Sequence, residues 1–204
     1  MPLLHAYQSP LLGIWEMTET WQEMFDSLEN KDIYEADLNK INSIKRKREW
    51  LSVRLLLQRL TRARTYIIYK TNGAPVLSDG SFNISISHTK GYAVILLSTT
   101  NHPGVDIEVR SDRAWQLKEK FLNKTELESL PSAIDVATIC WCAKETVYKA
   151  LGESAVDFSN QLHIEPFQLS NEGILFLHET RTTQKQRFTI HYQVNEPYIL
   201  TWKE

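Results

Sequence analysis

Two carboxylates stand two residues apart in the segment 104–109, which reads Gly-Val-Asp-Ile-Glu-Val. Alternate side chains of a β-strand share a face, so Asp106 and Glu108 are predicted to project together while the apolar residues beside them face the core. Hard oxygen donors in such a pair suit Mg²⁺, which keeps several waters and also binds substrate phosphates. The alternative is an ordinary solvated strand face.

A second polar group lies on the clearest helix of the sequence, predicted over 134–151. Its apolar residues recur at helical spacing. When the apolar stripe is buried, Glu145 and Lys149 lie outside it on the helix surface. Both side chains can therefore point into a cleft. They also form an i,i+4 pair in the order that stabilises a helix, so helix stability alone is the alternative explanation.

Two features of the first half of the chain could bind phosphate. Segment 40–64 holds nine Lys or Arg residues, Arg48 among them, and one acid, Glu49, which gives +8 in a protein of net charge −2. The remaining chain therefore carries −10, and this asymmetry predicts an anionic partner. Ser87 and His88 end an alternating strand, where a histidine could reach a phosphate. A solvated basic face and a structural histidine are the alternatives.

The predicted helices and strands, which must position these residues, follow one another along the chain in an irregular order. This mixed order favours an α+β fold over a doubly wound parallel sheet. A polar stretch at 99–103 is the best linker near the middle. Strands are predicted at 11–18, 65–69, 82–87, 92–98, 104–109, 173–178, 187–194 and 198–202. Helices are predicted at 40–63 and 134–151, and one or two short helices at 114–130, the second starting at Lys124.

Composition excludes several protein classes. Among 204 residues, six Trp, eight Tyr and seven Phe exclude intrinsic disorder, and seven Gly with seven Pro exclude a collagen-like chain. No apolar run approaches the roughly 20 residues of a membrane-spanning helix, and the N-terminus has no signal-peptide pattern. A cytoplasmic protein without a membrane partner is expected. Cys140 and Cys142 diverge on one helix, so no disulfide between them is expected.

In their order and spacing, these segments resemble the 4′-phosphopantetheinyl transferase superfamily, of the type that activates surfactin synthetase. The family's S-H-S turn, G-[IV]-D-[IV]-E strand and W-x-x-K-E-x-x-x-K helix correspond to 87–89, 104–108 and 141–149. The segment 121–126 is similar to its F-[FL]-x-x-x-E pattern, and 48–54 to its basic helix.

The sequence departs from the family pattern at two positions. Thr89 replaces the usual Ser, which is a mild change. Ala74 stands where many members have the Lys of a G-K-P turn that contacts phosphate, and Lys70 and Lys90 are the candidate substitutes.

The resemblance implies an enzyme of the holo-[acyl-carrier-protein] synthase type. It would move the 4′-phosphopantetheine group of coenzyme A (CoA) to a serine of an apo acyl or peptidyl carrier protein and release adenosine 3′,5′-bisphosphate. A monomer is expected, and nucleic acid is not expected as a partner. The resemblance further implies two similar α+β halves, 1–102 and 103–204, related by pseudo-two-fold symmetry, with the active site in the crevice between them.

The same resemblance assigns a role to each site residue. Mg²⁺, with Mn²⁺ as an alternative, would be held by Asp106, Glu108 and Glu145. Glu145 would accept the serine proton, Lys149 would neutralise the leaving group, and Glu126 would assist deprotonation. The residues expected to bind CoA are Arg48, Ser87, His88, Lys144 and Lys149.

Two other functions stay open at this point. A degenerate member of the family could bind CoA or a carrier protein without turnover, as the Ala74 departure suggests. A metal-dependent nuclease could use Asp106 and Glu108 beside the basic helix, although the net charge of −2 argues against it.

Overall fold

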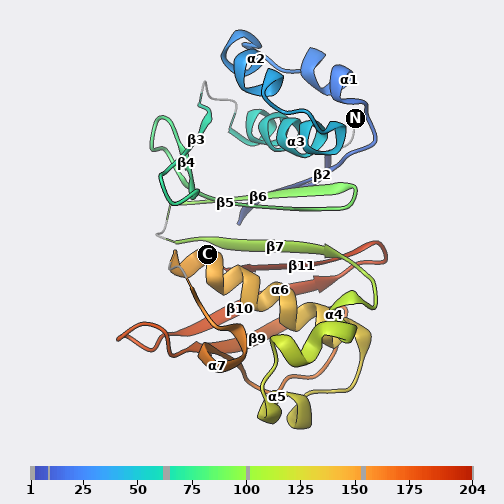
Figure 1. Ribbon diagram of the computed structural model, residues 1–204, viewed down its shortest axis with the longest axis vertical. Coiled ribbons are helices and arrows are strands. Elements are labelled where there is room, and N and C mark those ends of the chain that lie inside the picture. The colour runs from blue at the N-terminus through green and yellow to red at the C-terminus, as the bar shows by residue number, and fades with distance from the viewer. Residues whose placement is uncertain (1–2, 9, 62–64, 100–101, 153–154, 204) are drawn as a thin grey trace. The chain divides into compact units, whose positions relative to one another are not determined.

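The computed structural model describes residues 3–8, 10–61, 65–99, 102–152 and 155–203, and the chain forms two compact units, Met1–Asn101 and His102–Glu204 (Figure 1). In each unit a long helix packs on an antiparallel sheet, which confirms the predicted α+β class. The pseudo-two-fold relation between the units stays a prediction. None of the helices in the described ranges is long and apolar enough to cross a membrane.

The first unit has a four-stranded sheet of order β1-β2-β6-β5 and a separate β3–β4 hairpin. Its 18-residue helix α3 packs against β2 and β6. Its elements are β1 (Leu3–Gln8), β2 (Leu11–Glu16), α1 (Trp21–Asp26), α2 (Asp32–Asn39), α3 (Ile44–Thr61), β3 (Ile67–Tyr69), β4 (Pro75–Leu77), β5 (Asn83–Thr89) and β6 (Tyr92–Ser98).

Helix α3 starts four residues later than the predicted helix 40–63. The hydroxyl of Ser43 accepts the Arg46 amide at 3.3 Å, which caps the helix there, and residues 32–39 form the separate helix α2. Of the apolar residues that recur at helical spacing in the predicted helix 40–63, Ile44 is 65% exposed, whereas Leu51 and Leu56 are fully buried. Residues 62–64, which include two of the nine cations, lie outside the described residues.

The second unit has a five-stranded sheet of order β7-β11-β10-β9-β8. All its neighbouring strands are antiparallel. Its elements are β7 (Gly104–Val109), α4 (Arg113–Leu117), the 3₁₀ helix η1 (Lys118–Lys120), α5 (Lys124–Ser129), α6 (Ile134–Leu151), α7 (Phe158–Gln161), β8 (Leu162–Ile164), β9 (Glu172–Glu179), β10 (Arg187–Val194) and β11 (Tyr198–Lys203).

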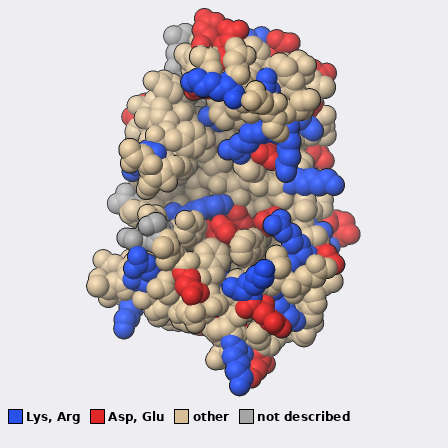
Figure 2. All heavy atoms as spheres, in the orientation of Figure 1, with Lys and Arg blue, Asp and Glu red and all other residues tan. Residues whose placement is uncertain are grey.

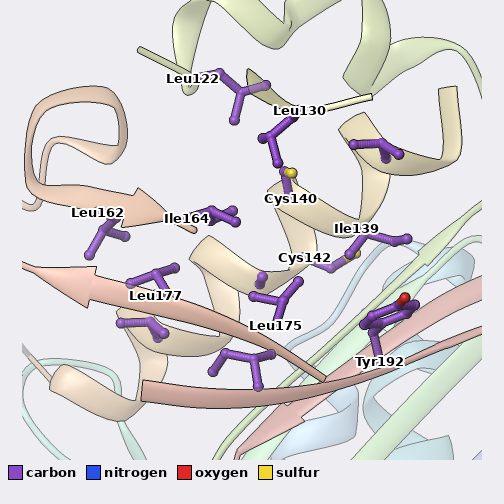
Figure 3. Packing of buried hydrophobic residues seen from close by; sticks show 14 of the residues in the cluster. Leu122, Leu130, Ile139, Cys140, Cys142, Leu162, Ile164, Leu175, Leu177 and Tyr192 are labelled. Atoms are coloured by element: carbon purple, nitrogen blue, oxygen red, sulfur yellow. The ribbon is translucent and has the colours of Figure 1, made fainter. Parts of the chain in front are cut away.

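Helix α6 has the predicted bounds 134–151 and forms the centre of this unit. The predicted apolar stripe at 136, 140, 143, 147 and 150 is buried throughout. Cys140 and Cys142 of α6 lie in the same cluster as Leu175 and Leu177 of β9 and Tyr192 of β10 (Figure 3). Both cysteines are unbridged, as expected. The core therefore fixes α6 against the sheet that carries Asp106 and Glu108.

Gly104 allows α6 to approach β7 very closely. A Cβ atom at this position would lie 2.2 Å from the carbonyl oxygen of Thr146, far inside van der Waals contact. The Thr146 hydroxyl also lies 2.7 Å from that of Thr201 on β11, the strand that pairs with β7. The small residue and the polar contact together set the distance between helix and sheet.

A buried ion pair fixes the opposite side of α6. The Lys144 ammonium, fully shielded from solvent, donates to the Glu126 carboxylate at 2.8 Å and to the carbonyls of Phe121 and Phe158 at 2.7 and 2.9 Å. The Glu126 carboxylate also accepts the amides of Asn123 and Ile164, each at 2.8 Å. The ion pair and its hydrogen bonds thus join five segments of the chain, and the buried charges of Lys144 and Glu126 are both compensated.

We expect Lys144→Met to destabilise the protein by about 3–5 kcal/mol, because it leaves a buried carboxylate without its cation. Urea unfolding at neutral pH measures the loss. The matched control is Lys124→Met, which breaks the exposed pair Lys124–Glu128, 3.8 Å apart, and should cost less than ~1 kcal/mol. Equal losses in the two variants would contradict a special role for the buried pair.

Candidate functional site

The two carboxylates of β7 lie on the face of the strand that α6 covers. Gly104 meets Thr146 on this face, and Asp106 meets Lys149 there. Val105 and Ile107 are fully buried on the opposite face, outside the apolar cluster of the unit. The two carboxylates share a face as predicted, and Val105 and Ile107 are buried as predicted, but on the side of the strand that α6 does not cover. Alternation defines two faces without telling which one a helix will cover.

Lys149 is the basic partner of Asp106. Its ammonium donates to the Asp106 carboxylate at 2.8 Å and to the Val105 carbonyl at 2.9 Å. Only 6% of the Asp106 side chain is exposed, against 25% of the Lys149 side chain. The buried carboxylate is therefore reached by a lysine that still contacts solvent, and Lys149 can interact with a bound anion from this position.

Glu108 is positioned by an aromatic side chain of α6. The Trp141 indole N–H donates to the Glu108 carboxylate at 3.3 Å. Trp141 in turn packs against Phe121 and Phe158, with ring centroids 5.2 and 5.6 Å away. The family-like motif thus contributes a residue that sequence reasoning did not assign to the site, although Trp141 begins the segment 141–149 that was singled out.

Glu145 lies in the field of both strand carboxylates. Burial raises its pKa to about 7, and the negative charges of Asp106 and Glu108 add to this effect while Lys149 opposes it. The fully buried Cys142 thiol hydrogen-bonds to Asp106, and burial together with the same two carboxylates raises its pKa well above the ordinary range. The four residues Asp106, Glu108, Glu145 and Lys149 therefore form one electrostatic group, which we call the acidic cluster.

The acidic cluster has the donor chemistry that a divalent ion requires. Its three carboxylates are hard oxygen ligands, and their mutual repulsion, visible in the raised pKa of Glu145, is what a cation would relieve. In the described parts of the chain, however, no three His, Cys, Asp or Glu side chains stand close enough to enclose an ion.

Lys144 and Glu126 lie away from this cluster, in the buried ion pair described above. All three ammonium protons of Lys144 have acceptors inside the protein, and its side chain is fully shielded. Its burial lowers the pKa of Lys144, and the Glu126 carboxylate opposes that shift. This arrangement does not support a contact of Lys144 with CoA or a proton transfer by Glu126. Both residues instead hold α5 and α6 in place.

The expected phosphate-binding residues of the first unit come from α3 and β5. Arg48 on α3 donates to the Met17 carbonyl. Ser87 is buried near the end of β5, and His88, the next residue, lies 2.9 Å from the Arg46 guanidinium through Nε2. Arg46 and Glu49 also contact each other, at 3.3 Å. Sequence reasoning left Arg46 and Glu49 out of the site, although Glu49 is the single acid of the basic segment and lies within the family-like segment 48–54.

The departure at Ala74 lies in the turn of the β3–β4 hairpin. The Lys70 amide donates to the Ala74 carbonyl at 2.9 Å, so these two residues face each other across the turn. Gly73 takes the left-handed conformation, with φ of 81°. Of the two candidate substitutes for the missing lysine, Lys70 therefore shares the turn with Ala74, whereas Lys90 lies between β5 and β6.

The second unit contains a cavity of about 490 Å³ beside the acidic cluster. Glu108 and Trp141 form part of its wall, and most of the remaining wall is apolar. Its other lining residues are Val109, Ser111, Arg113, Ala114, Leu117, Lys120, Phe121, Thr138, Val156, Asp157 and Phe158.

The exposed charges do not form a continuous basic field on the face drawn in Figure 2. Acidic side chains lie among the lysine and arginine side chains there. A duplex nucleic acid is usually bound by a clustered basic surface, so this face offers no support for the nuclease alternative.

The raised pKa of Glu145 predicts a pH-dependent stability in protein freed of divalent ions by a chelator. Between its ordinary value near 4.5 and about 7, the folded state retains a proton that the unfolded state has lost. This group therefore lowers the free energy of unfolding progressively as pH rises through that interval. Glu145→Gln should become more stable relative to the unmodified protein over the same interval and then level off. Urea unfolding at pH values from 4.5 to 8 measures this difference, and a constant difference would contradict the assignment.

Comparison with known proteins places both units in one family. Residues 103–202 match the 4′-phosphopantetheinyl transferase superfamily, and residues 35–98 match the 4′-phosphopantetheinyl transferase N-terminal domain. The first match contains the whole acidic cluster, and the second contains Arg48, Ser87 and His88. No curated protein matches the chain. The surfactin-activating subtype stays a prediction, but the two adjoining matches establish that the chain belongs to the 4′-phosphopantetheinyl transferase superfamily.

Proposed function

We propose that the protein transfers the 4′-phosphopantetheine group of CoA to a serine hydroxyl of an apo acyl or peptidyl carrier protein. The serine oxygen forms a bond to the phosphorus that carries the pantetheine arm. The bond from that phosphorus to the bridging oxygen breaks, and adenosine 3′,5′-bisphosphate leaves with the electron pair. Membership of the superfamily supports the transfer of phosphopantetheine. The site residues support the proposed transfer from CoA to a serine hydroxyl.

The main support for the proposal is the raised pKa of Glu145 in the acidic cluster. In the protein without a bound ion, the pKa of Glu145 is raised to about 7, so its carboxylate is a far better proton acceptor than an ordinary one and is still partly ionised at neutral pH. Glu145 is therefore our candidate base for the serine proton. After burial, the strand carboxylates also contribute to this shift, so Glu145 and the strand pair act as one group, which supports a catalytic role over an ordinary solvated strand face.

Other residues of the chain would bind and orient the substrates. Lys149 lies beside Asp106 and can neutralise charge that develops on the leaving phosphate. In the first unit, Arg48, Ser87 and His88 would hold CoA phosphates. The cavity beside Glu108 suits an uncharged chain with apolar stretches, which is the chemistry of the pantetheine arm.

Asp106, Glu108 and Glu145 would hold Mg²⁺ or Mn²⁺. When bound, such an ion supplies charge neutralisation and orientation for the diphosphate of CoA. Phosphoryl transfer depends mainly on positioning and electrostatics, so a site rich in carboxylates beside a lysine is suited to it.

The direct test incubates the protein with an apo carrier protein, CoA and Mg²⁺. Intact-mass analysis should then find one phosphopantetheine group added to the carrier, and a chelator should prevent the gain. Trials with several acyl and peptidyl carrier proteins cover the open choice of pathway. CoA binding without any mass gain across that set would favour the degenerate, binding-only alternative.

Glu145→Gln should lower the rate of transfer by about 10²–10⁴-fold, the usual contribution of a general base. The amide keeps the size of the side chain but cannot accept the serine proton. Glu128→Gln, at a position whose side chain is 68% exposed, is the matched control and should retain full activity. Unchanged initial rates for Glu145→Gln would remove this residue from the mechanism.

A further inference from the structure

A buried carboxylate lies among the cations of α3. The side chain of Glu49 is only 9% exposed, although it belongs to the most basic segment of the chain. The Lys45 ammonium lies 3.7 Å away, and the Arg46 guanidinium lies 3.3 Å away, both on the same helix. These two contacts have the i,i+4 and i,i+3 spacings that join neighbours on one helix face. Helix stability alone would explain them.

The third contact of Glu49 comes from another element and needs a different explanation. His88 is the second-last residue of β5, and its Nδ1 lies 3.9 Å from Glu49 Oε1. Its other nitrogen, Nε2, lies 2.9 Å from Arg46 Nη1. A guanidinium only donates, so Nε2 accepts from Arg46 and the ring proton of a neutral imidazole is on Nδ1, toward the carboxylate. Arg46 thus fixes the tautomer of His88, and the Glu49 carboxylate lies on the side of its Nδ1–H.

By its charge alone, the Glu49 carboxylate should weaken the binding of an anion. Lys45, Arg46 and Glu49 sum to +1, and loss of the Glu49 charge would raise this to +2. Simple electrostatics therefore predicts that an anion binds more tightly without Glu49. A positioning role predicts the opposite, because a mobile arginine loses entropy when it closes on a phosphate.

We propose that Glu49 is a positioning residue for CoA: it holds Arg46 against His88, so that the remaining N–H groups of the Arg46 guanidinium are preorganised to donate to one of the CoA phosphate groups. The proposal rests on the proposed function, since it takes CoA as the ligand, and it adds Arg46 to the phosphate-binding residues. The side chain of Arg46 is 54% exposed, so it can reach a ligand while the Glu49 carboxylate behind it stays buried.

The test measures the dissociation constant of CoA by calorimetry for the full-length protein and for Glu49→Gln. We expect affinity to fall about tenfold in the variant, the size of one charge-assisted hydrogen bond. In the transfer assay KM for CoA should rise to a similar extent, with little change in kcat. The matched control is Asp37→Asn, which removes the same charge from the exposed pair Asp37–Lys40 and should leave CoA affinity unchanged.

Two further variants separate positioning from a general loss of folding. Glu49→Asp restores the charge and should recover part of the affinity. In a His88→Ala background, Glu49→Gln should have a much smaller effect than in the unmodified protein, because the residue against which it holds Arg46 is gone. Titration with dephospho-CoA, which lacks the 3′-phosphate, identifies the phosphate concerned: if Glu49→Gln no longer matters for this ligand, the 3′-phosphate is the group bound.

Each remaining outcome has a distinct meaning. Unchanged or tighter CoA binding by Glu49→Gln would overturn the positioning role and leave the proposed function standing. An equal effect of Glu49→Gln with and without His88 would overturn it as well. Failure of the unmodified protein to bind CoA at all would refute the proposed function and this proposal together.

Discussion

The close approach of α6 to β7 is the constraint on which the candidate site depends. It is possible because Gly104 has no side chain where Thr146 contacts the strand, and a methyl group there would push the helix away. At this separation Lys149 reaches both the carboxylate of Asp106 and the backbone of Val105. Glu145, four residues before Lys149, is brought into the field of the strand carboxylates by the same contact. A glycine that looks unremarkable beside the acidic motif therefore decides whether that motif and the helix act together.

The opposite side of α6 is held by a different interaction, the buried pair Lys144–Glu126. Burying a lysine is costly, and here three acceptors compensate the cost. The pair connects α6 with the start of α5 and with the backbone of β8, so it controls the rotation of the helix as well as its position. Adjacent residues of one motif thus have separate tasks: Lys144 points into the protein and fixes the helix, while Glu145 points toward the strand carboxylates.

Charge in this protein is organised locally. The net charge of −2 is the sum of unevenly distributed charges, among them a basic segment and an acidic cluster. Each of these contains one residue of the opposite charge. Glu49 lies within the basic segment and contacts Lys45 and Arg46, and Lys149 lies within the acidic cluster and contacts Asp106. Such an ion between like charges reduces their repulsion and restricts their motion. Both sites are therefore ordered before a ligand binds, which reduces the entropy that binding must overcome.

The sequence by itself determined the α+β class, the exact extent of α6, the main strands of the second unit and the two motifs of the family. These depend on local periodicity, on residue type and on spacing along the chain, which one sequence contains in full. It did not determine the start of α3, the helix α2 or the exposure of Ile44, because capping and packing decide these features.

Among the site residues, the shared face of Asp106 and Glu108 followed from strand geometry alone. The tertiary structure decided that this face lies beneath α6, that Lys144 is buried and Lys149 is not, and that Trp141, Arg46 and Glu49 contact the proposed site residues. Each of these facts concerns residues that are distant in the chain, and burial and charge act through space. The sequence therefore identifies the chemical groups of the site, whereas the packing of helix on sheet determines their pKa values and the residues that they contact.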